Sequence, residues 1–296
     1  MKIALVVDNP YRDLPGLVLL AVELAARGAR CYLVPMNLQY RELWSLAPQF
    51  VMFNYLRINN ADLVHDLMNA GVKVGVLDTE GGVMPSFDSY SRTMPGDAQL
   101  RSRISCFFSW GRQLAEHAQQ AGWYRPDQVT VTGAPRYDFY AEPWRKAAMD
   151  SSMYAGEFKR PMVLINGSFP TVNPAFQSAQ DELKMLYTYF NYDKDWAISL
   201  HDNQKTAMLA LTRLCNVLAE KFPNVSFVYR PHPFERVETY NELLDKKPNL
   251  HLSRQGTVDG WLLRASVLIQ RGCSTAIDAN MAGIPALTPT WMPAPM

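Results

Sequence analysis

The sequence has few of the features that stabilise secreted or membrane-spanning proteins. Its 296 residues include four cysteines, which are widely spaced and form no Cys-x-x-Cys pair. A disulfide framework and a structural zinc site both lack their usual pattern, so we expect a cytoplasmic location. No apolar run approaches the roughly 20 residues that a membrane-spanning helix needs. The opening MKIALVVDNP predicts a buried first strand and no signal peptide.

The net charge of the chain is also small. The 29 basic and 28 acidic residues leave a formal charge of +1. Proteins that bind nucleic acid by broad electrostatic attraction carry large basic surfaces, so we expect no nucleic-acid partner. The P-loop, the HExxH motif and the GxSxG motif do not occur. The spacing of potential ligands indicates no metal, and we expect no resident cofactor.

What the sequence does contain is an alternation of short apolar runs with longer amphipathic segments. This rhythm predicts an α/β protein whose parallel strands are covered by helices on both faces. The expected strands are residues 2–7, 31–34, 50–53, 72–77, 106–109, 128–132, 162–165, 226–229, 250–252, 267–270 and 286–288. The expected helices include residues 14–27, 61–69, 112–120 and 204–221.

The alternation breaks once, at the segment TGAPR that begins at Thr132, and starts again at Pro161. We therefore predict a Rossmann-like domain over residues 1–140, a hinge or linker over 141–160, and a second Rossmann-like domain over 161–296. Ligands of parallel sheets bind beyond the carboxyl ends of the strands. The loops that follow the strands are therefore the places to search for a site.

The motif YRPHP, at the end of the expected strand 226–229, is the strongest candidate. Two prolines restrict the backbone around His232, and Arg230 lies beside it. A fixed imidazole and a guanidinium can bind phosphate, a ribose hydroxyl or a sugar carboxylate. The alternative is a surface turn that the prolines stabilise. The position directly after an apolar strand favours the binding role.

A second candidate follows the strand 267–270, where Gly272 forms a turn before an expected helix that starts near Ser274 and Thr275. A helix start offers free N–H groups and the positive end of the dipole, which favours phosphate binding. The alternative is that Thr275 and Asp278, at capping-box spacing, only cap the helix. A weaker candidate follows the strand 162–165, where the backbone can approach a ligand closely: Asn166, Gly167 and Ser168.

Carboxylates follow two other elements. Asp78 and Glu80 come after the strand 72–77 and precede two glycines, so they can act as acid or base, or simply lie in a solvated loop. Residues 83–96 form either an acceptor-binding loop or an insertion. Asp202 precedes the helix expected from residue 204. A capping role is favoured there over catalysis.

These motifs together resemble the GT-B glycosyltransferases of bacterial surface carbohydrate biosynthesis. They are most similar to retaining Kdo transferases that use CMP-Kdo. The matching stretches are VLDTEGG (76–82), VTGAPRYD (131–138), YRPHP (229–233) and RGCSTAIDANMAGIPAL (271–287). The HP and Ser/Thr elements are shared with sialyltransferase-like and CDP-glycerol phosphotransferase-like proteins. They therefore identify a superfamily better than a donor.

The resemblance implies a GT-B fold, in which two Rossmann-like domains with parallel sheets face a central cleft. It implies that His232 contacts the donor nucleotide and that Ser274 and Thr275 hold its phosphate. Family members similar to this chain use a carboxylate nucleophile, for which Glu80, Asp78 and Asp202 are the candidates. The implied reaction needs no metal, because a CMP-linked sugar leaves as a nucleoside monophosphate.

The leading hypothesis is a glycosyltransferase that moves a sugar, with Kdo from CMP-Kdo as the candidate, to a glycan or lipid-linked glycan acceptor. The role would be polysaccharide or lipopolysaccharide synthesis at the cell envelope, with no transmembrane segment but compatible with peripheral membrane association. A CDP-polyol phosphotransferase and a nucleotide-sugar epimerase-like enzyme are alternatives. A non-catalytic binding protein is another. GT-B proteins usually continue with further helices, whereas this chain ends at Met296, so the second domain is either truncated, naturally short or part of a degenerate copy.

Overall fold

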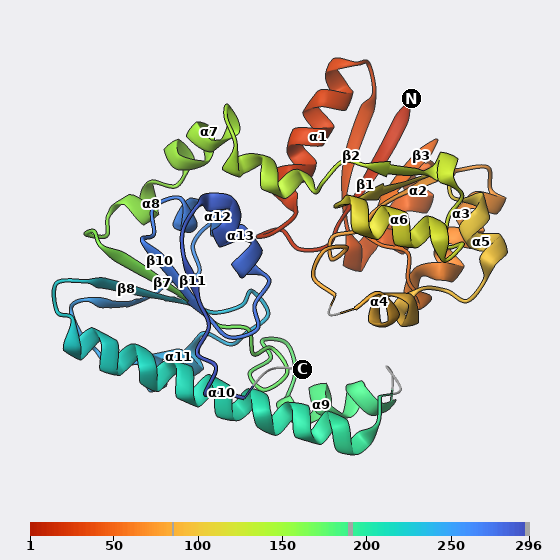
Figure 1. Cartoon of the computed structure of the whole chain (residues 1–296). Helices are drawn as coiled ribbons and strands as arrows, with labels where there is room; N and C mark the ends of the chain where they lie inside the picture. The colour runs from red at the N-terminus through yellow and green to blue at the C-terminus, as the bar shows by residue number, and fades with distance from the viewer. Residues whose placement is uncertain (85, 189–191, 294–296) are drawn as a thin grey trace. The chain divides into compact units, whose positions relative to one another are not determined.

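The computed structural model describes residues 1–84, 86–188 and 192–293 (Figure 1). The chain divides into two compact units, Met1–Phe139 and Tyr140–Met296, and each unit contains one parallel sheet. This is the α/β architecture that the alternating pattern predicts. Residues 141–160, which we expected to form a linker, contain two helices and belong to the second unit.

The sheet of the first unit has six parallel strands in the order β2-β1-β3-β4-β5-β6. Side chains of its central strands are fully buried on both faces, as in other parallel sheets that helices cover on each side. The strands are β1 (Lys2–Val7), β2 (Arg30–Pro35), β3 (Phe50–Phe53), β4 (Lys73–Leu77), β5 (Cys106–Ser109) and β6 (Val129–Val131).

Among the described residues of the first unit, six α-helices and four short 3-10 turns accompany these strands, and the last of these turns follows β6. The α-helices are α1 (Leu14–Ala26), α2 (Gln39–Leu46), α3 (Ala61–Asn69), α4 (Phe87–Thr93), α5 (Ala98–Arg103) and α6 (Arg112–Gln120). The 3-10 turns are η1 (Met36–Leu38), η2 (Ile58–Asn60), η3 (Pro126–Gln128) and η4 (Pro135–Tyr140). Helix α1 lies against the start of η4, because a Cβ atom at Gly16 would come within 2.7 Å of the backbone nitrogen of Arg136.

The sheet of the second unit has five parallel strands in the order β11-β10-β7-β8-β9. The strands are β7 (Met162–Asn166), β8 (Ser226–Arg230), β9 (Leu250–Leu252), β10 (Val267–Gln270) and β11 (Ala286–Leu287). The helices are α7 (Trp144–Ser151), α8 (Met153–Gly156), α9 (Ala179–Thr188), α10 (Lys194–Lys221), α11 (Glu238–Leu243), α12 (Val258–Leu262) and α13 (Thr275–Ala282). Figure 1 shows α10 running along its sheet.

The start of α10 differs from the expectation. The helix begins at Lys194, and the side chain of Asp193 caps it by accepting a 2.8 Å hydrogen bond from Trp196 N. The prediction that Asp202 caps a helix from Gln204 is therefore wrong. The helix extends further because Ala197 and Leu200 already supply a buried face before that point.

Within the described ranges, no helix is long and apolar enough to cross a membrane.

Candidate functional site

A cluster of charged side chains occupies the carboxyl end of the first sheet, in the loops after β1, β3 and β4 and in the turn after β6. This carboxylate–arginine cluster consists of Asp8, Asp13, Asp78, Glu80, Arg12, Arg57 and Arg136. Sequence analysis found Asp78 and Glu80, because both follow a strand directly. It missed the arginines, whose importance depends on which loops meet in space.

Glu80 is the accessible carboxylate of the cluster, with about a third of its side chain exposed (32%). Its Oε2 lies 2.9 Å from Arg57 Nη2, and its Oε1 lies 3.7 Å from Arg12 Nη1. Burial opposes ionisation, but the two guanidiniums outweigh it and lower the pKa of Glu80. Glu80 is therefore an ionised acceptor held in a fixed position.

Asp78 lies in a different environment, although it is separated from Glu80 by one residue. It is 1% exposed and accepts hydrogen bonds from Tyr90 Oη (2.6 Å) and from the backbone N of Glu80 (2.8 Å). Burial raises the pKa of Asp78, although Arg57 at 3.6 Å and the Tyr90 hydrogen bond oppose the rise. The two carboxyl groups are thus pushed in opposite directions, which is the usual division between an acid and a base.

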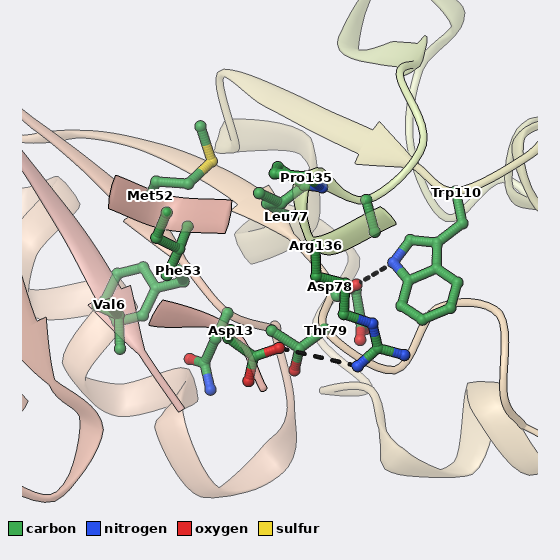
Figure 2. A pocket seen from close by; sticks show the side chains of 13 residues that line it. Val6, Asp13, Met52, Phe53, Leu77, Asp78, Thr79, Trp110, Pro135 and Arg136 are labelled. Atoms are coloured by element: carbon green, nitrogen blue, oxygen red, sulfur yellow. Dashed lines mark hydrogen bonds and ion pairs between the residues drawn. The ribbon is translucent and has the colours of Figure 1, made fainter. Parts of the chain in front are cut away.

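Arg136 closes one side of a small pocket beside Asp78 (Figure 2). Its guanidinium carbon lies 4.8 Å from the ring centroids of both Trp110 and Tyr137, and its Nη1 lies 3.8 Å from Asp13. The indole of Trp110 donates a 2.5 Å hydrogen bond to the backbone carbonyl of Asp78. The pocket measures about 30 Å³. That volume holds about two waters but no sugar.

The Nε–H of Arg136 is buried and has no hydrogen-bond partner among the residues that the structure describes. Arg57 Nε, also in the cluster, is in the same state. Buried donors in native proteins are nearly always paired, so an unpaired one calls for an explanation. Both guanidiniums belong to the wall of the site, where a ligand or ordered water can supply the missing acceptor.

A larger hollow of about 370 Å³ opens on the other side of Trp110. Its volume falls within the range of small-molecule pockets, and its walls combine aromatic rings with a few polar groups. Residues from the loop after β4, from α4 and from the start of α6 line it, including Gly82, Met84, Phe87, Tyr90, Trp110 and Gln113. Position 82 must be glycine, because a Cβ atom there would lie 2.2 Å from the indole ring.

In the second unit, three strands end side by side at the residues that the sequence singled out. Asn166 pairs in register with Arg230 on β8 and with Gln270 on β10. Its Nδ2 donates a 3.0 Å hydrogen bond to Thr275 Oγ1, which joins the loop after β7 to the start of α13. This hydrogen bond connects two of the loops that the sequence singled out, those after β7 and β10.

The predicted capping box at the start of α13 is wrong. The Thr275 hydroxyl donates to Cys273 Sγ at 3.1 Å, and Asp278 accepts a 3.0 Å hydrogen bond from Tyr140 Oη. The N-cap residue, Ser274, makes no side-chain capping bond either. Each side chain finds a tertiary partner that local sequence does not reveal.

Arg230 is buried, and its guanidinium donates to the carbonyls of Gln255 (2.8 Å) and Gly256 (2.5 Å). These bonds order the loop after β9. Gly167 is also sterically required, because a Cβ atom there would lie 2.7 Å from Tyr229 Oη. Both residues, which we expected to contact the ligand directly, therefore have a clear role in shaping the loops.

His232 is held by a residue that sequence analysis missed. The buried carboxylate of Glu235 accepts hydrogen bonds from the backbone N of His232 (2.9 Å), from the backbone N of Phe169 (3.0 Å) and from Tyr240 Oη. Phe234 N donates to His232 Nδ1 at 3.2 Å. A signal was present: an acidic residue two positions after the RPHP turn.

The remaining predicted residues are placed as follows. Ser168 is half-buried after β7, and Gly272 has a left-handed backbone with φ of +67° in the turn before α13. Asp202 lies inside α10 with 72% of its side chain exposed, 3.3 Å from His201 Nδ1. Nowhere in residues 1–84, 86–188 and 192–293 do three His, Cys, Asp or Glu side chains gather as metal ligands would.

No family model matches the sequence, and no curated protein matches it. The fold, however, is similar to that of solved structures. MnaA of S. aureus, solved with UDP, superimposes with a TM-score of 0.63 and 12% identity over 97% of this chain and 78% of that chain. UDP-GlcNAc 2-epimerase of Neisseria meningitidis, bound to UDP-GlcNAc, gives 0.57 and 15% over 97% and 82%. The wall teichoic acid polymerase TagF, variant H548A, gives 0.52 and 11% over 97% and 69%.

These similarities confirm the predicted GT-B fold. They do not support the Kdo transferase family, and the predicted glycosyltransferase function is wrong. Structures named as UDP-GlcNAc 2-epimerases recur among the neighbours, and an epimerase-like enzyme is the alternative that sequence analysis held. The error has a physical reason. Strand-end HP and Gly-Ser/Thr elements bind nucleotide phosphates whatever happens to the sugar, so they do not report the reaction.

Proposed function

We propose that this chain is a nucleotide-sugar epimerase whose substrate is a UDP-linked N-acetylhexosamine such as UDP-GlcNAc. The fold shared with UDP-GlcNAc 2-epimerases supports this proposal. The observation that carries it is the pair Asp78 and Glu80, whose pKa values shift in opposite directions at one strand end. An acid and a base with separated proton affinities are what a proton-moving reaction at a sugar carbon needs.

Epimerisation inverts one ring carbon of the sugar. The C2–H bond breaks as its proton passes to a base, and the electron pair forms a C1=C2 double bond while the nucleoside diphosphate leaves C1. An acid then returns a proton to the opposite face of C2, and the diphosphate adds back at C1, so the nucleotide sugar is restored with C2 inverted. Glu80, ionised and partly exposed, is the proposed base. Asp78, whose pKa burial raises, is the proposed acid or proton reservoir. Arg12 and Arg57 hold Glu80 in position and stabilise negative charge that develops nearby.

The sugar is proposed to lie in the 370 Å³ hollow, because Gly81 and Gly82 line it and follow Glu80 directly in the chain. Pockets of this size and aromatic character suit a small polar ligand. In the second unit, the loops that meet at the start of α13, where Asn166 binds Thr275, are proposed to bind phosphate groups. Thr275 and His232 lie in the same group of loops.

The proposal is tested by incubating the protein with UDP-GlcNAc in D₂O and following the product by NMR. We expect the C2 epimer to form, with deuterium replacing the hydrogen at C2. Because general acid–base groups contribute about 10²- to 10⁴-fold, Glu80→Gln and Asp78→Asn should each lower kcat at least about 100-fold. UDP affinity should change little, since neither residue belongs to the proposed diphosphate site.

Asp127→Asn is the matched control, because Asp127 is an exposed carboxylate of the same unit that also pairs with an arginine, Arg125. This variant should retain full activity. Absence of any epimer or deuterium exchange with UDP-linked N-acetylhexosamines would reject the proposed reaction. Full activity in both Glu80→Gln and Asp78→Asn would reject the assigned residues.

A further inference from the structure

The loops after β7 and β8 are joined into a short antiparallel ribbon. Pro174 and Glu235 form an antiparallel bridge. Backbone hydrogen bonds flank it on each side: Ala175 N donates to Phe234 O at 2.8 Å, and Arg236 N donates to Asn173 O at 3.0 Å. Two loops that belong to different strand ends therefore form a single structural element, named here the β7–β8 ribbon (residues 173–175 and 234–236).

Side chains fix the ribbon to the body of the second unit. Asn173 Nδ2 donates to the carbonyl of Arg236 at 2.8 Å, and Thr239 Oγ1 donates to Asn173 Oδ1 at 2.8 Å. Beneath it, Glu235 is fully buried and accepts its three hydrogen bonds, one of them from the backbone of His232. Buried polar networks with every member paired are rigid, so the ribbon is a firm support.

This support holds two phenyl rings in solvent. Phe176 follows the ribbon with 84% of its surface exposed, and Phe234 lies on it with 42% exposed. Their ring centroids are 6.2 Å apart, and the ring of Phe234 lies 5.5 Å from that of His232. Rings this exposed add little to the core of the unit. Exposed apolar groups on a rigid support, next to polar groups that can bind a ligand, are typical of a recognition surface.

We propose that Phe176 and Phe234 form an aromatic platform that stacks against the base of the bound nucleotide. This inference rests on the proposed function, which supplies a nucleotide sugar as ligand. The base is the flat part of that molecule, and any base offers a π-face to an aromatic side chain. The ribbon ties the platform to His232, and Asn166 at the same sheet edge binds Thr275 at the start of α13.

The test is titration calorimetry of the full chain with UDP, pyrophosphate and GlcNAc-1-phosphate. Stacking of one base on an aromatic side chain is worth about 1–3 kcal/mol, and 1.4 kcal/mol is tenfold in affinity. The double variant Phe176→Leu, Phe234→Leu keeps apolar volume but removes both rings. It should weaken UDP binding about tenfold and leave pyrophosphate and GlcNAc-1-phosphate binding unchanged.

Phe222→Leu is the matched control, since Phe222 is an equally exposed phenylalanine (50%) at the end of α10 in the same unit. It should bind all three ligands as the unaltered chain does. A Phe176→Tyr, Phe234→Tyr variant keeps both rings and should keep the affinity for UDP. Its failure to do so, with its melting temperature unchanged, would overturn the platform.

Other results would overturn it as well: UDP binding that is unchanged in the leucine variant, weakening confined to GlcNAc-1-phosphate, or no UDP binding by the unaltered chain. The platform and the epimerase can fail separately. If UDP binding depends on the rings but no epimer forms in D₂O, the proposed reaction fails and the platform stands. If the epimer forms and the rings do not affect UDP binding, the platform alone is rejected.

Discussion

At the scale of single residues, the neighbours of a carboxyl group decide its chemistry. Asp78 and Glu80 follow the same strand, yet one is enclosed and the other is paired with two arginines. The sequence places both in one loop, because they follow an apolar run that predicts a strand and they precede two glycines. It cannot assign their proton affinities, since Arg12 and Arg57 reach them from other loops.

This contrast gives opposite pH dependences of stability. The folded-state pKa of Asp78 is raised, so its stabilising contribution is present below the unfolded value near 3.8 and is lost as pH rises through the folded value. The folded-state pKa of Glu80 is lowered, so its contribution is present above the unfolded value near 4.5 and is lost as pH falls through the folded value. Melting temperatures should be measured from pH 3 to pH 7. As pH rises, the melting temperature of Asp78→Asn should increase relative to that of the unaltered chain, and that of Glu80→Gln should decrease relative to it.

Asp66→Asn serves as the control for this pair, because Asp66 is an exposed carboxylate on α3 in the same unit (52% side-chain exposure). Its melting temperature should follow that of the unaltered chain across the range. Parallel pH profiles for Asp78→Asn and Glu80→Gln would show that their environments do not differ as described.

Glu235 gives a second prediction at this scale. Glu235→Ala leaves two backbone N–H groups and the Tyr240 hydroxyl without their acceptor, and each buried unpaired group costs about 1–3 kcal/mol. The free energy of unfolding, measured in urea, should fall by about 3 kcal/mol or more. In Glu235→Gln the amide oxygen can serve both N–H groups and the NH₂ can donate to Tyr240, so we expect a loss of about 1 kcal/mol or less. Equal losses in the two variants would contradict this account.

At the scale of elements, close backbone approaches set the shape of the site. Gly16→Ala would place a Cβ atom 2.7 Å from Arg136 N and 2.8 Å from Pro135 C, both of them backbone atoms. Helix α1 must then move away from the turn that positions Arg136. Overpacking of this kind costs about 1–3 kcal/mol, so thermal unfolding should detect it and epimerase activity should fall. Gly96→Ala is the control, since nothing lies within 4 Å of its added methyl group, and it should change neither.

Elements also show how far the sequence alone can predict the structure. The apolar runs predicted β1, β3, β5, β9 and β10 at their observed bounds, because burial on both faces leaves a local signature. The ends of the helices and their caps were harder to predict from the sequence. Asp202 looked like a cap, but Asp193 performs that role, and Asp278 binds Tyr140, which lies far away in the sequence. Such partners are set by tertiary packing, which no local pattern encodes.

At the scale of the whole molecule, each unit has its own sheet and its own core. Domains with these properties commonly fold alone. Residues 140–296, produced separately, should unfold cooperatively in urea and bind UDP with an affinity close to that of the full chain, since the proposed nucleotide groups lie there. Residues 1–139 should fold but bind no UDP. Binding of UDP by residues 1–139 alone would contradict the division of roles.

The whole fold does not decide the reaction, as the neighbours make plain. An epimerase and a polymerase share the architecture of this chain, at 15% and 11% identity to it. Function on a common scaffold resides in a few grafted side chains. The side chains proposed for that role here are the carboxylate–arginine cluster of the first unit and the loops around His232 in the second. Neither of these two groups of residues could be predicted from the fold class alone.

The β7–β8 ribbon constrains how this protein can change over evolutionary time. The backbone of each loop supplies hydrogen-bond partners to the other. Lengthening or shortening one loop alone would therefore leave backbone groups of the other loop without a hydrogen-bond partner. Insertions in the two segments should therefore arise together in descendants of this chain, and an engineer who wishes to graft new specificity here must exchange both segments as a pair.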